Sequence, residues 1–449
     1  SVLDTTPSVN RQTLFNYLHH GRVDYSNLTF FEGIINLTPG HYIEVTSSGY
    51  SSEKRWWFFN SSQRKSTVPL LREIFKDSVR LRMRSDVPVG ACLSGGIDST
   101  AIVNSALRLT NDNFNTYSAI TEDNWKNSEN RYITLASQKE KISPKYVKPS
   151  GENLIKNLKK IIRLQEEPFT TPAIYSQWEV MKLAKENGAK VLLDGQGADE
   201  ILCGYHYFYS YFLFELYKKG KYSKLIFEII QISKKTKSYK FINVFIFLIL
   251  PKKIREQLLR KINSCLNNEY FDTKINRNQV LEDLIEADSI STICDNHLKH
   301  KLQHLLRYED KNSMAFSIES RTPFLDYRLV RYCIDGPSDF HIKKGYTKYS
   351  FRKSMKGIVE KDILSRTDKI GFKTMEDSWM ASDKFKKFVL ENLTSKSFKN
   401  RDYFDHEKVS RLLNNYVEGR KVDLKLLWRI LNVELWSREF FGESKLKSN

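Results

Sequence analysis

The alternation of short apolar runs with longer helical periods predicts an α/β fold for the middle of the chain. Short runs rich in β-forming residues lie at 87–93, 114–120, 145–147 and 190–193. Between and around them, apolar residues recur at helical spacing over 70–83, 101–109, 130–139, 152–164 and 174–186. Strands separated by helices indicate a doubly wound parallel sheet, and such sheets bind ligands at the carboxyl ends of their strands.

The pattern differs on both sides of this region. Residues 14–20 have helical spacing, and residues 33–45 read as a β segment interrupted by a Pro39-Gly40 turn. We therefore predict a small unit at 1–60, a linker at 61–67 and the α/β domain at 68–449. Within that domain, residues 205–304 are helical, aromatic and basic, and we read them as a helical insertion that forms a wall or lid near the pocket. An apolar helical stripe at 427–436 closes the domain.

A glycine-rich loop follows the first strand. Residues 94–99 read Ser-Gly-Gly-Ile-Asp-Ser, and helical spacing resumes behind them. Backbone N–H groups of such a loop, at the positive end of a helix dipole, can bind phosphate. The loop has no P-loop lysine and carries Asp98 instead. A carboxylate beside phosphates is repulsive unless a divalent cation bridges them, so Asp98 predicts Mg²⁺. A glycine turn that binds nothing is the alternative.

A second loop of this kind follows the strand at 190–193. Residues 194–200 read Asp-Gly-Gln-Gly-Ala-Asp-Glu. Glycines let a ligand approach the backbone closely, and carboxylates suit a metal ion. A turn with solvated acids is the alternative. In a parallel sheet this loop and the first one lie at the same edge.

A third stretch, residues 308–326, reads as a helix ended by Thr322-Pro323. Glu319 and Arg321 are close enough in sequence to pair with each other or to bind a zwitterionic substrate. A structural ion pair and a substrate contact both stay open at this point.

Composition narrows the class of protein. The 449 residues carry a net charge of +19, but the lysines are spread along the chain rather than gathered in one patch, which does not favour a nucleic-acid partner. The five cysteines show no metal-binding spacing, and this suits a reducing compartment such as the cytoplasm. No apolar run reaches the ~18 residues of a membrane span, so we expect no membrane partner.

Four blocks resemble the asparagine synthetase (glutamine-hydrolysing) family. Residues 94–99 match the SGGxDS signature of ATP pyrophosphatases, and 195–200 resemble the family motif GxGxDE. Residues 310–326 resemble the family segment DxxxMAxSxExRxPFLD. Residues 364–373 resemble the block that carries a phosphate-contacting lysine, which corresponds to Lys369. Lys348 to Arg352 also resembles a family pattern, for which we expect packing or a secondary phosphate contact.

The resemblance implies a sheet of the adenine nucleotide α-hydrolase (PP-loop) type with a nucleotide at the strand ends. The residues expected to bind ATP are Leu93, Ser94, Gly95, Gly96, Asp98, Ser99, Ile120, Asp194 and Gly195. Asp98 and Asp199 would hold Mg²⁺. The residues expected to act in catalysis are Lys369, Gln196, Glu319 and Arg321.

The implied function is an ATP-dependent amide-forming ligase. A carboxylate would attack ATP to give an acyl-adenylate and pyrophosphate, and ammonia would then displace AMP. Aspartate is the expected acceptor, and a homodimer is an open expectation. Gln196 stands where the family has a Glu thought to deprotonate ammonia, and a Gln cannot act as a base. The acceptor could therefore be another carboxylate, such as that of a uronic acid sugar.

The first sixty residues resemble the end of the family's glutaminase domain. Residues 37–45, Leu-Thr-Pro-Gly-His-Tyr-Ile-Glu-Val, and the pair Trp56-Trp57 carry this likeness. The family's glutaminase nucleophile is a cysteine, yet no cysteine precedes Cys92. We therefore expect residues 1–60 to be the C-terminal remnant of a glutaminase domain, in a piece of a longer chain. As given, the chain would use free ammonia, whereas full-length relatives take it from glutamine.

Two other functions stay open. The tRNA-modifying pyrophosphatases share SGGxDS, although they lack the blocks at 195–200 and 310–326. A homologue retained as a non-catalytic scaffold is the other, and the presence of Asp98, Asp199 and Lys369 together argues against it.

Overall fold

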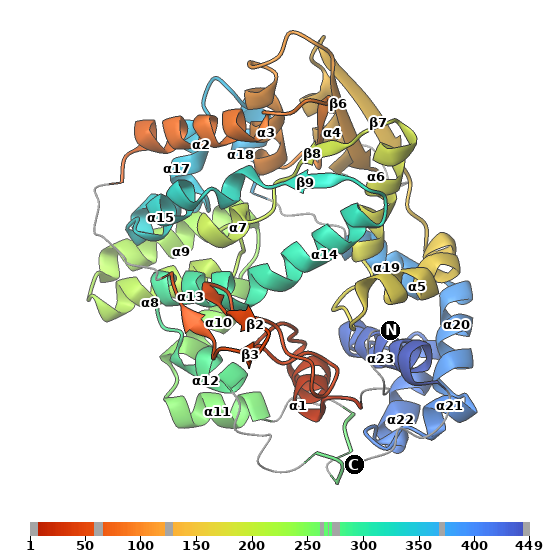
Figure 1. Cartoon of the computed structure of the whole chain (residues 1–449). Helices are drawn as coiled ribbons and strands as arrows, with labels where there is room; N and C mark the ends of the chain where they lie inside the picture. Colours follow the sequence, from red (N-terminus) through yellow and green to blue (C-terminus); the bar gives the residue numbers. More distant parts are fainter. Residues whose placement is uncertain are drawn as a thin grey trace.

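A five-stranded parallel sheet forms the centre of the molecule. The computed structural model describes residues 8–57, 66–121, 129–260, 265–267, 269–271, 279–367 and 373–442. The strand order is β7-β6-β5-β8-β9, and every pairing is parallel (Figure 1). The strands are β5 (Val89–Cys92), β6 (Phe114–Ala119), β7 (Ile142–Val147), β8 (Val191–Leu193) and β9 (Glu319–Arg321). The predicted parallel sheet is confirmed.

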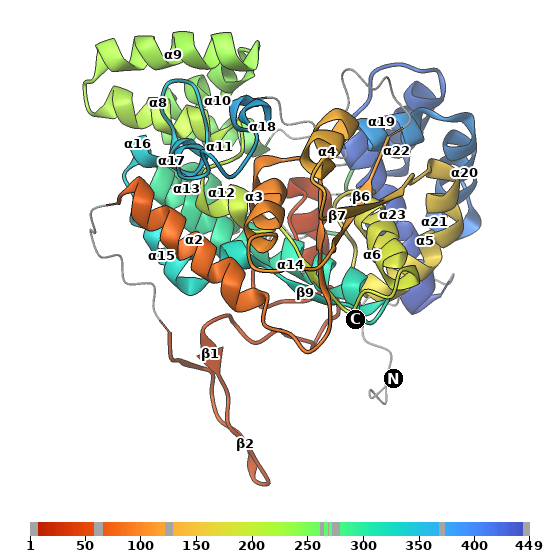
Figure 2. The same ribbon diagram turned by 90° about the horizontal axis from the view of Figure 1, so that it is seen from above.

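Helices pack on both faces of this sheet. α3 (Ile97–Ala106) packs against β5 and α2 (Val68–Arg82), while α6 (Ile174–Glu186) packs against β6 and β7. Figure 2 shows the sheet between α3 and α6. Separate apolar clusters fill the two sides, one including Phe75 and Ile102 and the other including Met181 and Leu192. The fold is therefore doubly wound, as the periodicity predicted.

The other helices around the sheet are short, apart from α5 and α14. They are α4 (Glu129–Ser137), α5 (Gly151–Gln165), α7 (Ala198–Ile201), α14 (Leu302–Met314), η4 (Pro323–Leu325), α15 (Tyr327–Ile334), α16 (Ser338–His341), α17 (Tyr349–Ser354) and α18 (Lys361–Ser365).

The segment 205–304 is helical, as predicted, and has an apolar cluster of its own. Its helices are α8 (Phe208–Lys218), α9 (Tyr222–Thr236), α10 (Lys240–Ile249), α11 (Lys252–Arg260), α12 (Gln279–Glu286), α13 (Ile290–Asn296) and the π-helix η3 (His297–Lys301). Among the residues that the structure describes, no helix is both long enough and apolar enough to cross a membrane.

The C-terminal part, residues 373–442, consists of helices joined by short turns. Its helices are α19 (Lys373–Ala381), α20 (Asp383–Leu393), α21 (Lys396–Lys399), α22 (His406–Val417) and α23 (Leu424–Phe441). α23 contains the predicted stripe at 427–436, and Leu427, Ile430 and Trp436 are completely buried.

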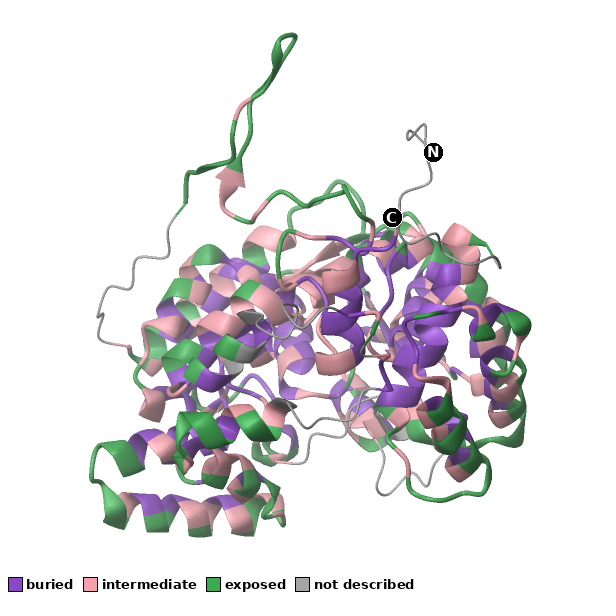
Figure 3. Cartoon of the chain, turned by 90° about the horizontal axis from the view of Figure 1, so that it is seen from below, coloured by how far each residue is buried: buried purple, intermediate pink, exposed green. Residues whose placement is uncertain are grey.

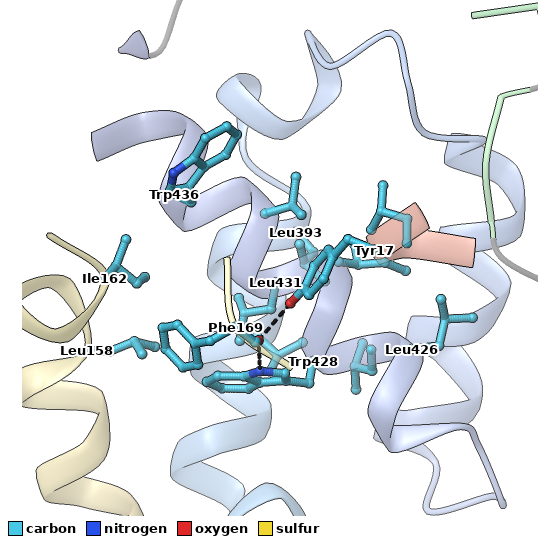
Figure 4. Close-up of a cluster of buried hydrophobic side chains, with 14 of the residues drawn as sticks. Tyr17, Leu158, Ile162, Phe169, Leu393, Leu426, Trp428, Leu431 and Trp436 are labelled. Carbon is cyan, nitrogen blue, oxygen red and sulfur yellow. Dashed lines mark hydrogen bonds between the residues drawn. The ribbon is translucent and has the colours of Figure 1, made fainter. Parts of the chain in front are cut away.

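The N-terminal residues are not a small unit of their own, contrary to our prediction. α1 (Arg11–Phe15) and the π-helix η1 (Asn16–His20) lie in the same apolar cluster as α5 and α23. Figure 4 shows Tyr17 donating to the carbonyl oxygen of Phe169 at 2.7 Å, and the indole of Trp428 donates to the same oxygen at 3.0 Å. Residues 8–31 thus belong to the main body.

Residues 33–57 form an arm that projects from this body. Its strands are β1 (His41–Tyr42), β2 (Val45–Thr46), β3 (Gly49–Tyr50) and β4 (Lys54–Arg55). Figure 2 shows the arm extending away from the sheet, and Figure 3 shows it exposed over nearly its whole length. The predicted β segment at 33–45 is realised only in part, because few residues of the arm find a neighbouring strand.

The stretch at 308–326 also differs from its prediction. α14 ends at Met314, eight residues before Thr322, and the chain continues as the three-residue strand β9. Ser317, between them, has a left-handed φ of 56° that a helix cannot contain. Pairing with β8, at Val191↔Glu319 and Leu193↔Arg321, makes this segment a strand.

Candidate active site

A cavity of about 380 Å³ opens at the carboxyl ends of β5, β6 and β8. The sheet brings the two glycine-rich loops together, because β5 and β8 are hydrogen-bonded neighbours with Ala91 opposite Leu193. Eight predicted site residues line the cavity: Leu93, Ser94, Asp98, Ser99, Asp194, Gly195, Gln196 and Asp199.

The first loop is a tight turn that leads into α3. Gly95 has a φ of +70°, and a Cβ there would come within 2.6 Å of the Ile133 backbone nitrogen, so only glycine fits. The Ser99 hydroxyl accepts from the backbone N–H of Ser94 at 3.2 Å. Ser94 in this turn, and Asp98 and Ser99 in the first turn of α3, line the cavity, and a glycine-rich loop at the positive end of a helix can bind an anion.

Asp98 and Asp199 converge on one point, where Lys348 lies. The ammonium nitrogen of Lys348 is 2.5 Å from an oxygen of Asp98 and 2.7 Å from an oxygen of Asp199. The Lys348 side chain is 5% exposed. It comes from the residue that precedes α17, where the backbone has a φ of 52°. Burial disfavours the charge, but the attraction of Asp199 and Asp98 outweighs it, so the pKa of Lys348 is raised.

This geometry fits a magnesium ion that is completed by phosphate oxygens. Mg²⁺ in nucleotide sites commonly takes one or two carboxylates and fills its other positions with water and phosphate. Asp98 and Asp199 supply such a pair from two strand ends, and the ammonium of Lys348 shows that a cation is stable between them. Among the described residues no cluster of three or more His, Cys, Asp or Glu could hold a metal unaided.

A buried polar network continues from Asp199. The neighbouring Glu200 is 1% exposed. Burial first, and then the charge of Asp199, raise the pKa of Glu200. The Tyr205 hydroxyl donates to Glu200 at 2.5 Å, and the Lys301 ammonium lies 3.3 Å from the Tyr205 ring centre. The network anchors the segment that carries Asp199 to η3.

A second group of buried acids, Asp194 and Glu309, lies at the floor of the cavity, and Asp194 lines it. Burial raises the pKa of Asp194, and burial together with the charge of Asp194 raises the pKa of Glu309 well above its usual range. The Ser320 hydroxyl donates to Glu309. Cys92 also lines the cavity, and burial raises the pKa of its thiol. The raised pKa values favour the neutral forms of these groups at the floor of the cavity.

Away from the two loops the cavity is lined by neutral polar side chains together with apolar residues such as Ile174 and Val180 and the acid Glu129. Thr170 and Thr171 precede α6, Gln177 lies on α6, and Tyr308 lies on α14. The Tyr308 hydroxyl accepts from the Thr170 backbone N–H at 3.3 Å, and the Thr171 hydroxyl donates to Glu376 at 2.6 Å. These side chains offer hydroxyl and amide groups to a small polar ligand.

Some predicted residues lie beside the cavity without lining it. Gly95 and Gly96 shape the first loop, and Ile120 follows β6 with its N–H donating to the Val147 carbonyl at 2.9 Å. Lys369 falls outside the described residues. The helical insertion at 205–304 contributes no residue to the described lining.

Glu319 and Arg321 form the ion pair that the sequence left open as one of two readings, and a contact of these residues with substrate stays a prediction. The Arg321 Nε atom lies 2.7 Å from Glu319, and the guanidinium also donates to the carbonyl oxygens of Arg82 and Arg84 at 2.8 and 2.6 Å. Neither residue lines the cavity. On a strand, alternate residues face opposite sides, so Ser320 contacts Glu309 near the cavity floor while Glu319 and Arg321, which pair with each other, face the other side.

Lys348 is the residue whose importance the sequence interpretation missed. Its block, Lys348 to Arg352, carries in that interpretation only a packing role or a secondary phosphate contact. The sequence did contain a signal for this role. Lys348 lies within a pattern that resembles the family, and the phosphate loop of this chain has no lysine of its own. What the sequence could not show is the contact with Asp98, 250 positions earlier.

Comparisons with known proteins show a family and several relatives to which this chain is similar. The family model described as Asparagine synthase matches residues 70–438. "Asparagine synthetase [glutamine-hydrolyzing] 1" of Bacillus subtilis (strain 168) is 26% identical over 423 residues, covering 89% of this chain and 64% of that protein. A "Putative asparagine synthetase [glutamine-hydrolyzing]" of Mycobacterium tuberculosis (strain ATCC 25618 / H37Rv) is 26% identical over 406 residues, covering 83% and 57%. "Amidase chyE" of Penicillium rubens is 23% identical over 401 residues, covering 76% and 58%. The chain thus spans less than two thirds of the length of these relatives.

Proposed function

This chain belongs to the asparagine synthase family, and from that premise we propose that it is an ATP-dependent amide-forming ligase. A carboxylate oxygen of the acceptor attacks the α-phosphorus of ATP, and the bond to the β-phosphate bridging oxygen breaks, giving an acyl-adenylate and pyrophosphate. Ammonia then attacks the acyl carbon, AMP leaves, and one proton is released as the amide forms.

The convergence of Asp98 and Asp199 beside the loop at 94–96 supports this proposal most directly. A magnesium ion held by this pair would neutralise charge that develops on the pyrophosphate. The loop's N–H groups would bind phosphate, and Lys348 would keep the two carboxylates together before nucleotide binds. Lys369 stays a proposed phosphate contact.

Aspartate is the acceptor that the family relationship favours, and ammonia the nitrogen donor for the chain as given. An alternative acceptor with a single carboxylate and several hydroxyls, such as a uronic acid sugar, has support from the cavity. Among the described lining residues none is Lys, Arg or His that could pair with a second carboxylate. Gln196 lines the cavity and cannot take a proton from ammonia.

The test measures AMP and pyrophosphate release by the purified chain with Mg-ATP, ammonium and a panel of acids. The panel contains aspartate, glutamate, glucuronate and galacturonate. We expect release that depends on one acid, with amide formed in equal amount. Asp98→Asn and Asp199→Asn should each lower the rate about 100-fold or more, and Asp112→Asn, at an exposed position, serves as the matched control.

Each outcome assigns or rejects a part of the proposal. Turnover with aspartate alone dismisses the sugar alternative, and turnover with a uronic acid alone dismisses aspartate. Release of ADP and phosphate, or unchanged AMP release in Asp98→Asn and Asp199→Asn, would contradict the ligase. Tight tRNA binding that weakens steeply with salt would favour the tRNA-modifying alternative instead.

Gln196 allows a separate experiment on the proton of ammonia. Gln196→Glu introduces a side chain that can act as a base, so the amide-forming step should gain a dependence on pH with loss of rate in acid. Gln196→Ala should leave the shape of the pH profile unchanged. A profile that changes equally in both variants would show that Gln196 acts through position and not through its missing charge.

A further inference from the structure

The helix α9 presents apolar side chains to solvent. Tyr222, Ile226, Phe227 and Ile230 are exposed by 58%, 59%, 47% and 45%. Their spacing of four, five and eight positions places them on one face of the helix. Leu225 and Ile232 occupy the opposite face and are buried. Four large exposed apolar residues on one face of the 15-residue helix α9 form a patch rather than scattered single residues.

The only acidic residue of α9, Glu228, lies on the buried side of the helix. Glu228 is 1% exposed and accepts from the backbone N–H groups of Lys344 and Gly345, both at 3.0 Å. α9 is therefore fixed to the body by its inner face. The outer apolar face is not a consequence of poor packing, because the inner face already has its apolar and polar contacts.

The surroundings of the patch are strongly basic. Residues 218–255 contain eleven Lys or Arg and a single acidic residue, Glu228. Lys221 precedes the apolar face, and Lys234 and Lys237 follow it; all three are exposed. In the described part of the chain these three lysines have no acidic partner, whereas Lys218 and Lys224 pair with Asp288 and Asp339.

The position of α9 leaves the patch accessible. Figure 2 shows α9 at the periphery of the molecule, at the end opposite the β2–β3 hairpin of the arm. It packs on α8, and its outer side faces away from the body. No residue of α9 lines the cavity, so the catalytic site does not account for this surface.

We propose that α9 docks the protein onto an anionic lipid surface, lying flat with its apolar face among the acyl chains and its flanking lysines on acidic headgroups. Helices with an apolar face bordered by lysines bind membrane interfaces in this way, and each added cation strengthens attraction to anionic lipid. Our sequence prediction excluded a membrane partner because no segment can span a bilayer. A helix that lies on the surface needs no span.

The lysines around α9 favour an anionic lipid surface over a second copy of the chain as its binding partner. Two copies meeting through α9 would bring together two lysine-rich surfaces without acidic partners, and like charges repel. An anionic bilayer supplies both the apolar phase and the negative charge.

The experiment compares sedimentation of the full chain with vesicles of phosphatidylcholine alone and vesicles containing one third phosphatidylglycerol. We expect binding to the anionic vesicles, weakened at high salt, and little binding to the neutral ones. A triple variant, Ile226→Ser with Phe227→Ser and Ile230→Ser, should bind at least tenfold more weakly. Lys221→Gln with Lys234→Gln and Lys237→Gln should lose the preference for anionic lipid.

A matched control keeps these results specific. Leu70→Ser with Leu109→Ser and Tyr327→Ser removes three exposed apolar side chains from other surfaces and should bind as the parent does. Equal sedimentation with both kinds of vesicle, or unchanged binding by the α9 variants, would overturn the proposal. A parent protein that is dimeric in solution and becomes monomeric in the α9 apolar variant would assign the face to self-association and would also overturn it.

Discussion

The backbone N–H of Gly204 donates to the carbonyl oxygen of Asp199 at 2.9 Å. This bond holds the Gly204 α-carbon against the Asp199 side chain. A Cβ at Gly204 would lie 1.8 Å from the Asp199 carboxylate and 2.3 Å from the Lys348 side chain. The absence of a side chain at position 204 is therefore a requirement of the candidate metal site.

Gly204→Ala should displace Asp199 and Lys348 while leaving the fold intact. Both neighbours contact the new methyl group through side-chain atoms, which can move more easily than the backbone. We expect the rate of AMP release to fall about 100-fold, as small misplacements of reacting groups do, with a higher Mg²⁺ requirement. Steady-state kinetics across a magnesium titration measures both. Gly220→Ala, at a position with open space around it, places the same substitution away from the site and should keep the magnesium requirement of the parent.

Lys348→Met should be strongly destabilising, because it leaves two carboxylates facing each other in a buried place. Loss of one partner from a buried ionic contact typically costs about 3–5 kcal/mol, which urea unfolding can measure. Added Mg²⁺ should raise the melting temperature of Lys348→Met more than that of the parent protein. Lys353→Met, at an exposed lysine of α17, the helix that Lys348 precedes, should show neither effect.

The raised pKa of Lys348 determines how the stability of the fold changes at alkaline pH. A base whose pKa is higher in the folded state stabilises the fold fully below its unfolded pKa of about 10.4. That stabilisation disappears as the pH rises through the folded value. The parent protein should therefore lose stability above this pH more steeply than Lys348→Met. Parallel losses in both proteins would contradict the contact.

Glu309→Gln should stabilise the protein at neutral and alkaline pH. The pKa of Glu309 is raised by burial, so the folded state holds a proton that the unfolded state has already released. Stability then falls as the pH rises from about 4.3 toward the folded pKa. The uncharged amide would remove this slope and should raise the free energy of unfolding at pH 8 by about 1 kcal/mol or more. Urea titrations across the pH range measure it, with the exposed Glu282→Gln as control; an unchanged slope would show that Glu309 is ionised in the folded state.

Tyr17→Phe tests the place of the N-terminal residues. The variant removes the hydroxyl that donates to Phe169, while Trp428 still donates to the same carbonyl oxygen. We expect a loss of about 1 kcal/mol, the usual net contribution of one such bond, from a single unfolding transition. If calorimetry showed that Tyr17→Phe affects only a separate, smaller unfolding transition, residues 8–31 would not share a core with the rest of the protein.

The parts of the fold with local signals were predictable. α6 begins and ends where its periodicity indicates, at Ile174 and Glu186, because a long amphipathic helix repeats its pattern over several turns. The turn at Gly95 was predictable because glycines mark positions where the backbone adopts conformations that other residues disfavour. The sheet edge that carries Asp98 and Asp199 followed from the alternation of strands and helices.

The parts that depend on distant partners were not predictable. β9 is three residues long, too short for a periodic signal, and it is a strand only because β8 lies beside it. The role of Lys348 depends on two acids from loops 149 and 250 positions away. The docking of η1 on α23 likewise follows from tertiary packing, since the polar linker and the β pattern suggested a separate unit.

The bond between Tyr17 and Asn432, at 3.4 Å, joins positions 415 residues apart. During synthesis on the ribosome the first helices are made long before the helix that covers them. Their apolar faces therefore stay exposed until α23 has been synthesised and can pack on them. Production of this protein should therefore respond to the supply of chaperones, and chains that terminate before α23 should aggregate or be degraded.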